Sequence, residues 1–491
     1  MVNKLKLGIS CWLFLQSGLA IQAQTAGVDI VVKGVVFEDK NGNGLQDKGE
    51  HALKDILLSN GVDIVSSDKK GKFVLSAKKG QSIFPILPSA YKKTNVTSKV
   101  SNANFLYLNP NQNFTDTVNY AVSLTKVLAN KAPFTIGAIG DIQVDSEEEV
   151  TFAAKSIFKE LAQRNDLTLN LMLGDLVNNK MELLADVKEL MEYLPQASWT
   201  LVGNHDRHVE NPMFMNDVFN QTFGADRYAF NQGAVHFVVL NNVYATGKNS
   251  YEGRVDEEQL LFLKNDLKHV PKQTTIVISQ HIPMAHTRNR DEIFNLLAGY
   301  ERVLILTGHT HTVNRYFFAN THIQEIGVGA TCGTWWRGEK NSDGIPEAVM
   351  QCGTPRGYFT IHFTENNYAI QYKAVGLDAH KQASLVQEDD KLVANVYAGS
   401  DSTEVKLKID EGEWQTMTQT KRVDPYILTV VEKNKSKVYP TLGNSMNPVT
   451  KRASTHIWEL PLPKEPSNKI RKVTLVASDC YGLNITEEFI F

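Results

Sequence analysis

The middle of the chain alternates between short apolar runs and longer stretches in which apolar residues recur three and four positions apart. The short runs predict strands at 134–139, 167–173, 198–202, 235–240, 274–279, 303–307 and 359–363. The longer stretches predict helices at 146–164, 181–194 and 256–267. Strands that alternate with helices predict an α/β domain, in which functional side chains lie beyond the strand ends.

The two ends of the chain lack this helical spacing. Short runs separated by turn residues predict N-terminal strands at 31–37, 56–58, 63–65, 72–75 and 82–86, which suggests a small β-sandwich. C-terminal strands are predicted at 391–397, 403–409, 426–431 and 470–477, with 456–460 as an edge strand because prolines follow it. We therefore predict an N-terminal β domain at 28–130, an α/β domain at 133–374 and a C-terminal β domain at 375–491.

The first 23 residues have the pattern of a secretory signal peptide. Lys4 and Lys6 precede an apolar stretch that begins at Leu7, and the small residue Ala23 stands at the expected cleavage position. The apolar stretch is too short to span a bilayer comfortably, and no later stretch could serve as a transmembrane segment. We expect a protein that is secreted or periplasmic after cleavage, with an uncleaved anchor as the alternative.

Composition and charge narrow the class of protein. With 42% apolar and 21% charged residues the chain is a folded globular protein, and a formal net charge of -3 argues against a surface that coats nucleic acid. Beyond the signal peptide, Cys332, Cys352 and Cys480 show no C-x-x-C spacing, so a cysteine-based zinc or redox centre is not expected. Cys332 and Cys352 share one glycine-rich segment and could form a disulfide after export.

Residues 39–50, directly after the first predicted strand, match the calcium-loop pattern D-x-[DN]-x-[DN]-G-x5-E. The spacing offers a cation the side chains or carbonyls of Asp39, Asn41, Asn43, Leu45, Asp47 and Glu50. No helical segment precedes the loop and two early ligands are neutral, so a plain turn between strands is an equal alternative. Bound calcium would stiffen this loop rather than take part in chemistry.

Polar clusters follow the predicted strands of the central domain at five points. They are Gly140-Asp141-Ile142-Gln143, Gly174-Asp175, Gly203-Asn204-His205-Asp206, Gln280-His281 and Gly308-His309-Thr310-His311. One such cluster alone is more often a polar turn or a satisfied core histidine. Five of them at successive strand ends indicate a site for two metal ions, because Asp141 and Asp175 would repel each other there without a counter-charge.

This set of clusters resembles the calcineurin-like metallophosphoesterase superfamily, whose pattern is D-x-H, G-D-x-x, G-N-H-[DE], H and G-H-x-H. The resemblance covers roughly residues 134–373, and the flanks resemble those of secreted bacterial members with β domains at both ends. It implies an α/β fold of the four-layer αββα sandwich type, flanked by two all-β domains. It also implies a hydrolase of phosphoric esters.

The resemblance further implies roles for the matching residues. The first metal would be held by Asp141, Gln143, Asp175 and His311, and the second by Asp175, Asn204, His281 and His309. A hydroxide bridging the two ions would attack phosphorus, with His205 as general acid and Asp206 orienting it. Gln143 stands where many members have His, and this oxygen donor favours manganese, magnesium or iron, while zinc stays possible.

The substrate stays open between phosphomonoesters and phosphodiesters, including phosphorylated lipids and glycans. Trp335, Trp336 and Arg337 follow a glycine-rich run near the expected cleft, where they could hold substrate or pack beneath the C-terminal domain. His286, Arg288 and Arg290 could bind phosphate or form a solvated loop. A second function is a degenerate enzyme whose β domains bind a surface glycan or polymer, although only Gln143 departs from the ligand pattern.

Overall fold

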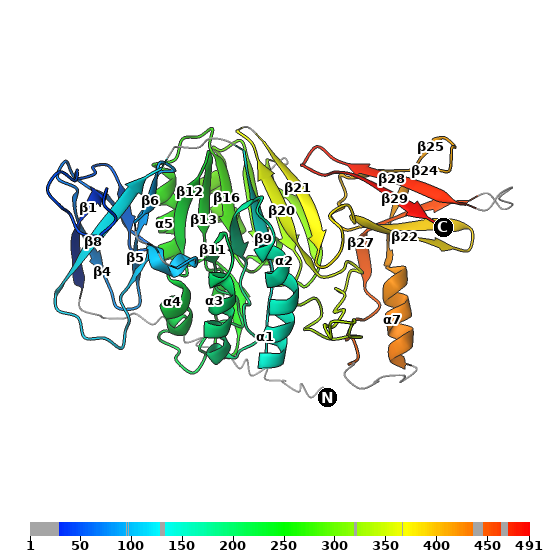
Figure 1. Cartoon of the computed structure of the whole chain (residues 1–491), viewed down its shortest axis with the longest axis horizontal. Helices are drawn as coiled ribbons and strands as arrows, with labels where there is room; N and C mark the ends of the chain where they lie inside the picture. Colours follow the sequence, from blue (N-terminus) through cyan, green and yellow to red (C-terminus); the bar gives the residue numbers. More distant parts are fainter. Residues whose placement is uncertain are drawn as a thin grey trace, which may run out of the picture.

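The computed structural model describes residues 29–94, 96, 98–127, 133–318, 322–365, 367–435, 445–462 and 470–491. The predicted signal peptide lies outside the described residues. Figure 1 shows three regions in a row, with the N-terminal strands (blue) and the C-terminal strands (orange and red) at opposite ends of a central α/β region. No helix among the described residues is long and apolar enough to cross a membrane.

The N-terminal region consists of two small sheets. The first has the order β4 (Lys72–Ala77), β1 (Ile30–Glu38), β8 (Thr117–Lys126) and β6 (Tyr91–Lys93). The second has the order β3 (Ile64–Ser66), β2 (Leu57–Ser59), β5 (Ser82–Ile86) and β7 (Leu106–Tyr107). The ring of Phe84 lies 6.1 Å from that of Phe262, which attaches this region to the central one.

The central region contains two larger sheets. The five-stranded sheet has the order β11 (Ala197–Thr200), β10 (Leu167–Met172), β9 (Phe134–Ile139), β20 (Gly357–Phe363) and β21 (Tyr368–Ala374). The six-stranded sheet has the order β12 (Tyr228–Gln232), β13 (Val235–Val239), β16 (Thr275–Ser279), β17 (Val303–Thr307), β19 (Ile323–Val328) and β18 (Val313–Phe318). Phe237 of one sheet meets Phe363 of the other with ring centroids 6.0 Å apart.

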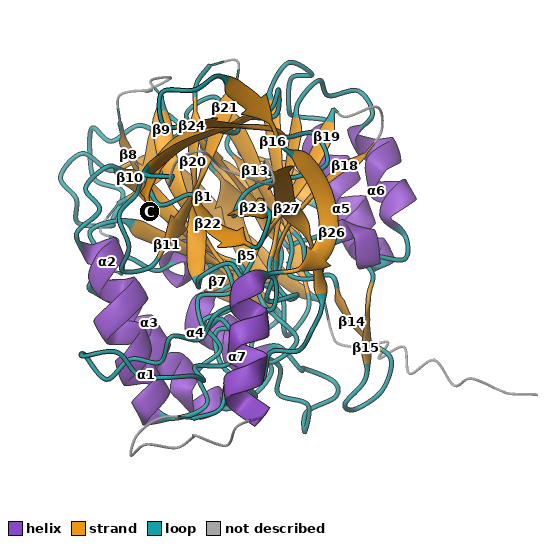
Figure 2. Cartoon of the chain, turned by 90° about the vertical axis from the view of Figure 1, so that its right-hand side faces the viewer, coloured by secondary structure: helices purple, strands orange, loops and turns teal. Residues whose placement is uncertain are grey.

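Helices cover the outer faces of these two sheets (Figure 2). On one side lie α1 (Glu147–Ala153), α2 (Lys159–Ala162), α3 (Leu184–Glu192) and α4 (Asp217–Phe223). On the other side lie α5 (Glu257–Leu267) and α6 (Arg290–Leu297). Two sheets between two helix layers confirm the predicted α/β sandwich, with additional β-rich regions at its ends.

The first predicted helix begins where the sequence indicates and contains an irregularity. The Ser146 side chain accepts a hydrogen bond from the backbone N–H of Glu149, which caps α1. A π-helical segment (Ala154–Phe158) separates α1 from α2. Such segments are rare and frequently lie at functional sites.

The C-terminal region again has two sheets. One has the order β22 (Ala383–Glu388), β23 (Lys391–Val396), β27 (Ala453–Pro461) and β26 (Thr418–Val423). The other has the order β25 (Trp414–Thr416), β24 (Glu404–Ile409), β28 (Lys472–Ser478) and β29 (Asn484–Ile490). The prediction of an edge strand at 456–460 is wrong, because β27 pairs on both sides and its proline comes only at its last residue.

The strand predicted at 426–431 is also wrong, because these residues form the helix α7 (Pro425–Lys435). Asp424 Oδ1 accepts the backbone N–H of Tyr426 at 2.8 Å, so an N-cap and a proline at the first helical position start the helix. Ile427 and Val430 then face one small apolar cluster. Capping and packing therefore override the preference of the β-branched residues for a strand.

A buried ion pair fixes the C-terminal region to the six-stranded sheet. Arg315 Nη1 of β18 lies 2.6 Å from Asp479 Oδ2, and neither side chain is accessible to solvent. The same guanidinium donates to the carbonyl oxygens of Ala398 and Tyr481. Because removing one partner of such a pair leaves a buried charge, this contact holds the two regions in one geometry.

Candidate metal centre

The predicted ligands lie at one edge of the central sandwich. Asp141, Asp175 and Asn204 follow β9, β10 and β11, which are parallel neighbours in the five-stranded sheet. His281 and His309 follow β16 and β17, which are parallel neighbours in the six-stranded sheet. Parallel strands end at the same edge, so residues far apart in the sequence meet there.

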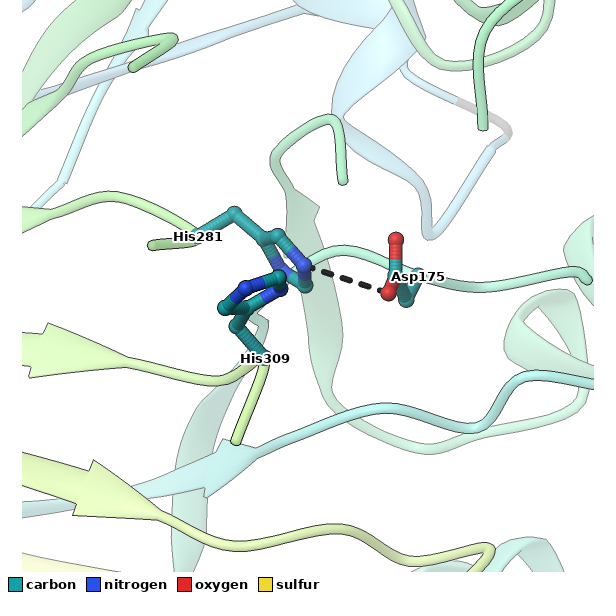
Figure 3. Close-up of side chains that lie close together, drawn as sticks. All are labelled: Asp175, His281 and His309. Atoms are coloured by element: carbon teal, nitrogen blue, oxygen red, sulfur yellow. Dashed lines mark ion pairs between the residues drawn. The ribbon is translucent and has the colours of Figure 1, made fainter. Parts of the chain in front are cut away.

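Asp175, His281 and His309 point toward one another (Figure 3), with their ligand atoms all within 4.8 Å of each other. His281 Nε2 lies 3.2 Å from Asp175 Oδ2 and 3.0 Å from Asn204 Oδ1. His309 Nδ1 lies 2.8 Å from the same Asn204 oxygen. These four residues are the complete set predicted for the second metal.

Backbone carbonyls define which ring nitrogens are free to coordinate. His281 Nδ1 lies 2.8 Å from the carbonyl oxygen of Leu173, so that nitrogen carries a proton and donates it. His311 Nδ1 lies 2.6 Å from the carbonyl oxygen of Gly333 in the same way. The Nε2 atoms of both rings therefore face carboxylate and amide oxygens, which fits a bound cation and matches how metal-binding histidines are usually oriented.

The residues predicted for the first metal are only partly assembled. His311 Nε2 lies 3.1 Å from Asp141 Oδ2. The backbone N–H of His309 donates to the Asp141 carboxylate at 3.0 Å, which places this pair next to the ligands predicted for the second metal. Gln143 is buried, but its amide nitrogen lies 3.4 Å from Asn178 Oδ1 and its oxygen accepts from the Cys332 thiol at 3.8 Å. Gln143 is thus held by neighbours that the sequence did not indicate.

Charges at this edge interact strongly. Burial lowers the pKa of His281, but the Asp175 carboxylate outweighs it and raises that pKa to about 9. Burial and the neighbouring His281 lower the pKa of His309 to about 4. Burial would raise the pKa of Asp175, yet His281 and His205 lower it. An ionised, buried carboxylate between imidazoles attracts positive charge to this point.

The backbone at the site is strained. Five predicted ligands have positive φ angles, namely Asp141 (23°), Gln143 (42°), Asp175 (48°), His309 (73°) and His311 (51°). Such conformations cost about 1–3 kcal/mol each in residues other than glycine, and they concentrate at functional sites. Strain at this one edge is an observation independent of the sequence motifs.

Two motif glycines are required by close approach. A Cβ atom on Gly203 would lie 2.1 Å from Asp175 Oδ1, and one on Gly308 would lie 2.3 Å from Asp141 Oδ1. Any larger residue would displace a carboxylate. Gly203 and Gly308 therefore allow the backbone to lie directly against the carboxylates of Asp175 and Asp141.

The role predicted for Asp206 is wrong in one respect. Its carboxylate accepts the backbone N–H groups of Leu176, Val177 and Gly203 at 2.8, 3.1 and 2.8 Å, rather than the ring of His205. His205 Nδ1 is buried and finds no hydrogen-bond partner among the described residues. The His205 backbone N–H donates to Asp175 Oδ1 at 2.8 Å, so its position depends on the site carboxylate.

The two tryptophans predicted near the cleft differ in their surroundings. Trp335 is 44% exposed, with its ring 4.9 Å from that of His311. Trp336 is 1% exposed, and its Nε1–H donates to the carbonyl oxygen of Ile142 at 2.9 Å. The suggestion that Trp336 holds substrate is therefore wrong, since packing and a hydrogen bond bury it. Arg337 is half-exposed, with Nη2 4.0 Å from Glu149 Oε1.

Residues that the sequence analysis missed also border the site. Arg207 is 5% exposed, and its guanidinium lies 5.2 Å from the ring centre of Tyr251 in β15 (Tyr251–Gly253). The Tyr251 ring lies 6.2 Å from that of His309. The sequence feature that could have identified Arg207 is its position directly after Asp206. On the loop after His281, Arg288 pairs with Glu252 and Arg290 donates to the Ala285 carbonyl, while His286 is exposed.

The candidate calcium loop is organised by its own hydrogen bonds. Asp39 accepts the backbone N–H groups of Gly42 and Gly44, and Glu50 accepts that of Asp47. Asn41 and Asn43 both donate to Asp47 Oδ2 at 2.7 Å, while Leu45 is exposed. Calcium binding by this loop stays a prediction. The three cysteines that the structure describes are free, so the suggested Cys332–Cys352 disulfide is absent from it.

Two protein-family models match this chain. Residues 134–313 match the family model of calcineurin-like phosphoesterases, and residues 325–484 match the model of the C-terminal part of these proteins. The sandwich and its carboxylate–histidine edge thus define a metal-dependent phosphoesterase. The chain belongs to the calcineurin-like phosphoesterases and is a phosphoester hydrolase.

A comparison with curated proteins found no match. Among solved structures, a purple acid phosphatase from yellow lupin (Lupinus luteus) seeds is similar, with 12% identity, a TM-score of 0.37, and coverage of 65% of this chain and 67% of the other. A 5'-nucleotidase from Candida albicans has 11% identity, a TM-score of 0.29, and coverage of 50% and 51%. A predicted phosphoesterase from Streptococcus pneumoniae has 10% identity, a TM-score of 0.26, and coverage of 50% and 90%.

Proposed function

We propose that the protein is an exported phosphoester hydrolase that works with two metal ions. The observation that carries the proposal is the adjacency of two donor sets. Asp175, Asn204, His281 and His309 form one set, and Asp141 with His311 begins the other. The backbone N–H of His309 donates to the Asp141 carboxylate, so the two sets are joined by a direct hydrogen bond. Manganese, iron, zinc and magnesium are the candidate ions, since oxygen and imidazole donors suit all of them.

The chain's own residues divide the remaining work. When bound, the metal ions would activate a water molecule and polarise a phosphoryl oxygen. We assign to His205 the transfer of a proton to the leaving oxygen, because it directly follows the ligand Asn204 in the G-N-H-[DE] pattern and its backbone N–H is fixed to Asp175 Oδ1. Such a general acid contributes on the order of 10²–10⁴-fold in rate.

The substrate in this proposal is a small phosphoester, or a phosphorylated lipid or glycan, that passes the exposed Trp335 to reach the metal ions. Monoesters and diesters both fit this description. Export rests on the signal-peptide pattern of the first 23 residues, and N-terminal sequencing of the protein recovered from the periplasm or medium tests it. An intact N-terminus on cell-associated protein would contradict export without affecting the enzyme assignment.

The experiment that tests the function measures metal content and turnover together. We expect purified protein to hold about two metal ions per chain and to cleave p-nitrophenyl phosphate or bis-p-nitrophenyl phosphate. Asn204→Ala should lose metal and activity, because it removes the oxygen that both His281 and His309 face. His205→Ala should keep the metal and lose about 10²–10⁴-fold in kcat.

The matched control is His380→Ala, which removes an exposed imidazole from the C-terminal region. It should change neither the metal content nor the turnover. If metal-replete protein cleaved neither ester nor any member of a wider phosphoester panel, the enzyme proposal would fail. The alternative of a degenerate, glycan-binding protein would then be favoured. A single metal ion per active chain would instead contradict the two-metal part of the proposal.

A further inference from the structure

A pocket lies beside α2 (Lys159–Ala162). It has a volume of about 470 Å³ and is bordered by the π-helical segment and α2, the loop at 341–347, and the chain on either side of β20 and β21. Lys155, Lys159, Glu160, Arg356, Val375 and Leu377 line it, and none of its lining residues is a predicted metal ligand. Its volume lies within the range of about 300–1,000 Å³ that is typical of small-molecule sites.

Arg356 in the wall of this pocket is a buried cation without a direct ion pair to any described residue. Its side chain is 8% exposed, and its guanidinium forms no hydrogen bond or ion pair with any residue that the structure describes. Nη1 is fully enclosed. The guanidinium lies over the ring of Trp336, whose centre is 5.3 Å from Arg356 Cζ, and the Glu160 carboxylate attracts it without forming an ion pair.

The contact with the Trp336 ring does not offset the cost of burying the Arg356 charge. A cation above an aromatic ring gains less free energy than the removal of a charged group from water costs. Burial lowers the pKa of Arg356 to about 10, although the Glu160 carboxylate partly opposes this. Buried charges in proteins are normally paired, and Glu160 is directly bound by other groups, so an anion from outside the chain would supply the pairing that Arg356 lacks.

With Glu160 paired to Lys373, the charged side chains left at the pocket are Arg356, Lys155 and Lys159 against Asp343 and Glu347, which leaves one positive charge in excess. Lys155 and Lys159 are exposed and form no ion pair with described residues. Glu160 is already bound by Lys373 at 2.9 Å, by the Tyr358 hydroxyl at 2.9 Å and by the Gly376 N–H at 2.8 Å. Glu347 accepts from the neutral Tyr426 hydroxyl and keeps its charge, so Glu347 and Asp343 are both exposed acids at the rim.

We propose that this pocket binds a small phosphate-bearing molecule, with Arg356 facing the phosphate group and Lys155 and Lys159 at the entrance. A planar guanidinium offers paired donors that match phosphate oxygens. Val375 and Leu377 supply an apolar wall for an organic portion. Inorganic phosphate and an organic phosphate share this recognition chemistry.

The test counts binding sites on the metal-loaded protein by calorimetry with phenylphosphonate, which resists hydrolysis. Wild type should bind two molecules, one at the metal centre and one in the pocket. Lys155→Glu/Lys159→Glu should lose one site, or weaken it at least 10-fold, while turnover of bis-p-nitrophenyl phosphate stays within about 2-fold of wild type. Arg356→Met should lose the same site.

Lys264→Glu/Lys268→Glu is the matched control, because it reverses two exposed lysines at the same spacing near the end of α5. It should retain both sites. If the Lys155/Lys159 variant binds as many molecules as wild type with unchanged affinity, the proposal is overturned, and this variant decides even if Arg356→Met fails to fold. Inorganic phosphate in a parallel titration identifies the source, since tighter pocket binding of the phosphonate indicates an organic ligand and equal binding indicates free phosphate.

Discussion

Asp206 Oδ1 accepts the backbone N–H of Leu176 at 2.8 Å and so ties the loop after β11 to the loop after β10. The other oxygen of the same carboxylate accepts the N–H of Gly203. Both loops carry predicted metal ligands, Asn204 and Asp175. Asp206 therefore holds two ligand-bearing loops at one spacing and does not bind the His205 ring.

Replacing Asp206 by Ala should lower stability more than it changes the chemistry. Three buried N–H groups would lose their acceptor, and each costs about 1–3 kcal/mol when left unsatisfied. We expect a clear fall in Tm together with weaker metal retention, measured by thermal unfolding and metal analysis. If Asp206 instead oriented His205, Asp206→Asn would shift the pH profile of kcat while leaving Tm nearly unchanged.

The two adjacent tryptophans should respond differently to truncation. Trp336→Ala removes a fully buried ring and its hydrogen bond to Ile142, so we expect a loss of about 3–5 kcal/mol in the free energy of unfolding. Trp335→Ala should change stability by about 0.5 kcal/mol or less and lower kcat/KM about 2- to 12-fold, as expected for one aromatic contact. Equal destabilisation by both substitutions would contradict the burial difference.

Glu325 in β19 should make stability depend on pH. Burial raises the pKa of its carboxyl group from 4.5 to about 7, although the Met284 N–H and the Thr307 hydroxyl partly oppose this. The folded protein therefore holds this proton more tightly than the unfolded chain does. Stability should be greatest below pH 4.5 for this group, fall by roughly 3 kcal/mol as pH rises to about 7, and then level off.

Glu325→Gln should abolish this part of the pH dependence and raise Tm at pH 8 relative to wild type. Glu365→Gln makes the same chemical change at an exposed position and is the control. Denaturant unfolding from pH 4 to pH 8 measures the difference between the variants. An unchanged slope in Glu325→Gln would show that other groups dominate the titration.

Calcium should stabilise the protein if the loop at 39–50 binds it. A ligand at 100 times its Kd raises the free energy of unfolding by about 2.7 kcal/mol, so calcium should raise Tm measurably at constant concentrations of the other metals. Asp39→Ala should remove this calcium-dependent increment. Asp68→Ala is the control, because Asp68 also accepts two backbone N–H groups in a turn, at 2.7 and 2.8 Å. A calcium response that survives Asp39→Ala would assign the ion elsewhere.

Much of the central region could be predicted from local patterns. The helix at 146–164 is predicted from apolar spacing, which is a property of neighbouring residues, and the structure adds the Ser146 cap. The strand prediction at 426–431 failed because an N-cap at Asp424 and an apolar cluster with Val349 outweighed local preference. Hydrophobic periodicity and helix caps are signals carried by neighbouring residues, whereas the apolar cluster that α7 packs into joins residues far apart in the chain.

The sequence by itself determined the class of the fold, the order of the five polar clusters and their position at strand ends, because strand length and spacing are local properties. Only the tertiary structure decided which partners the side chains have there. Asp206 binds backbone amides, Gln143 faces Asn178 and Cys332, Trp336 is buried, and Arg356 forms no direct ion pair with a described residue. Each of these outcomes depends on contacts between distant segments, which hydrophobic periodicity does not encode.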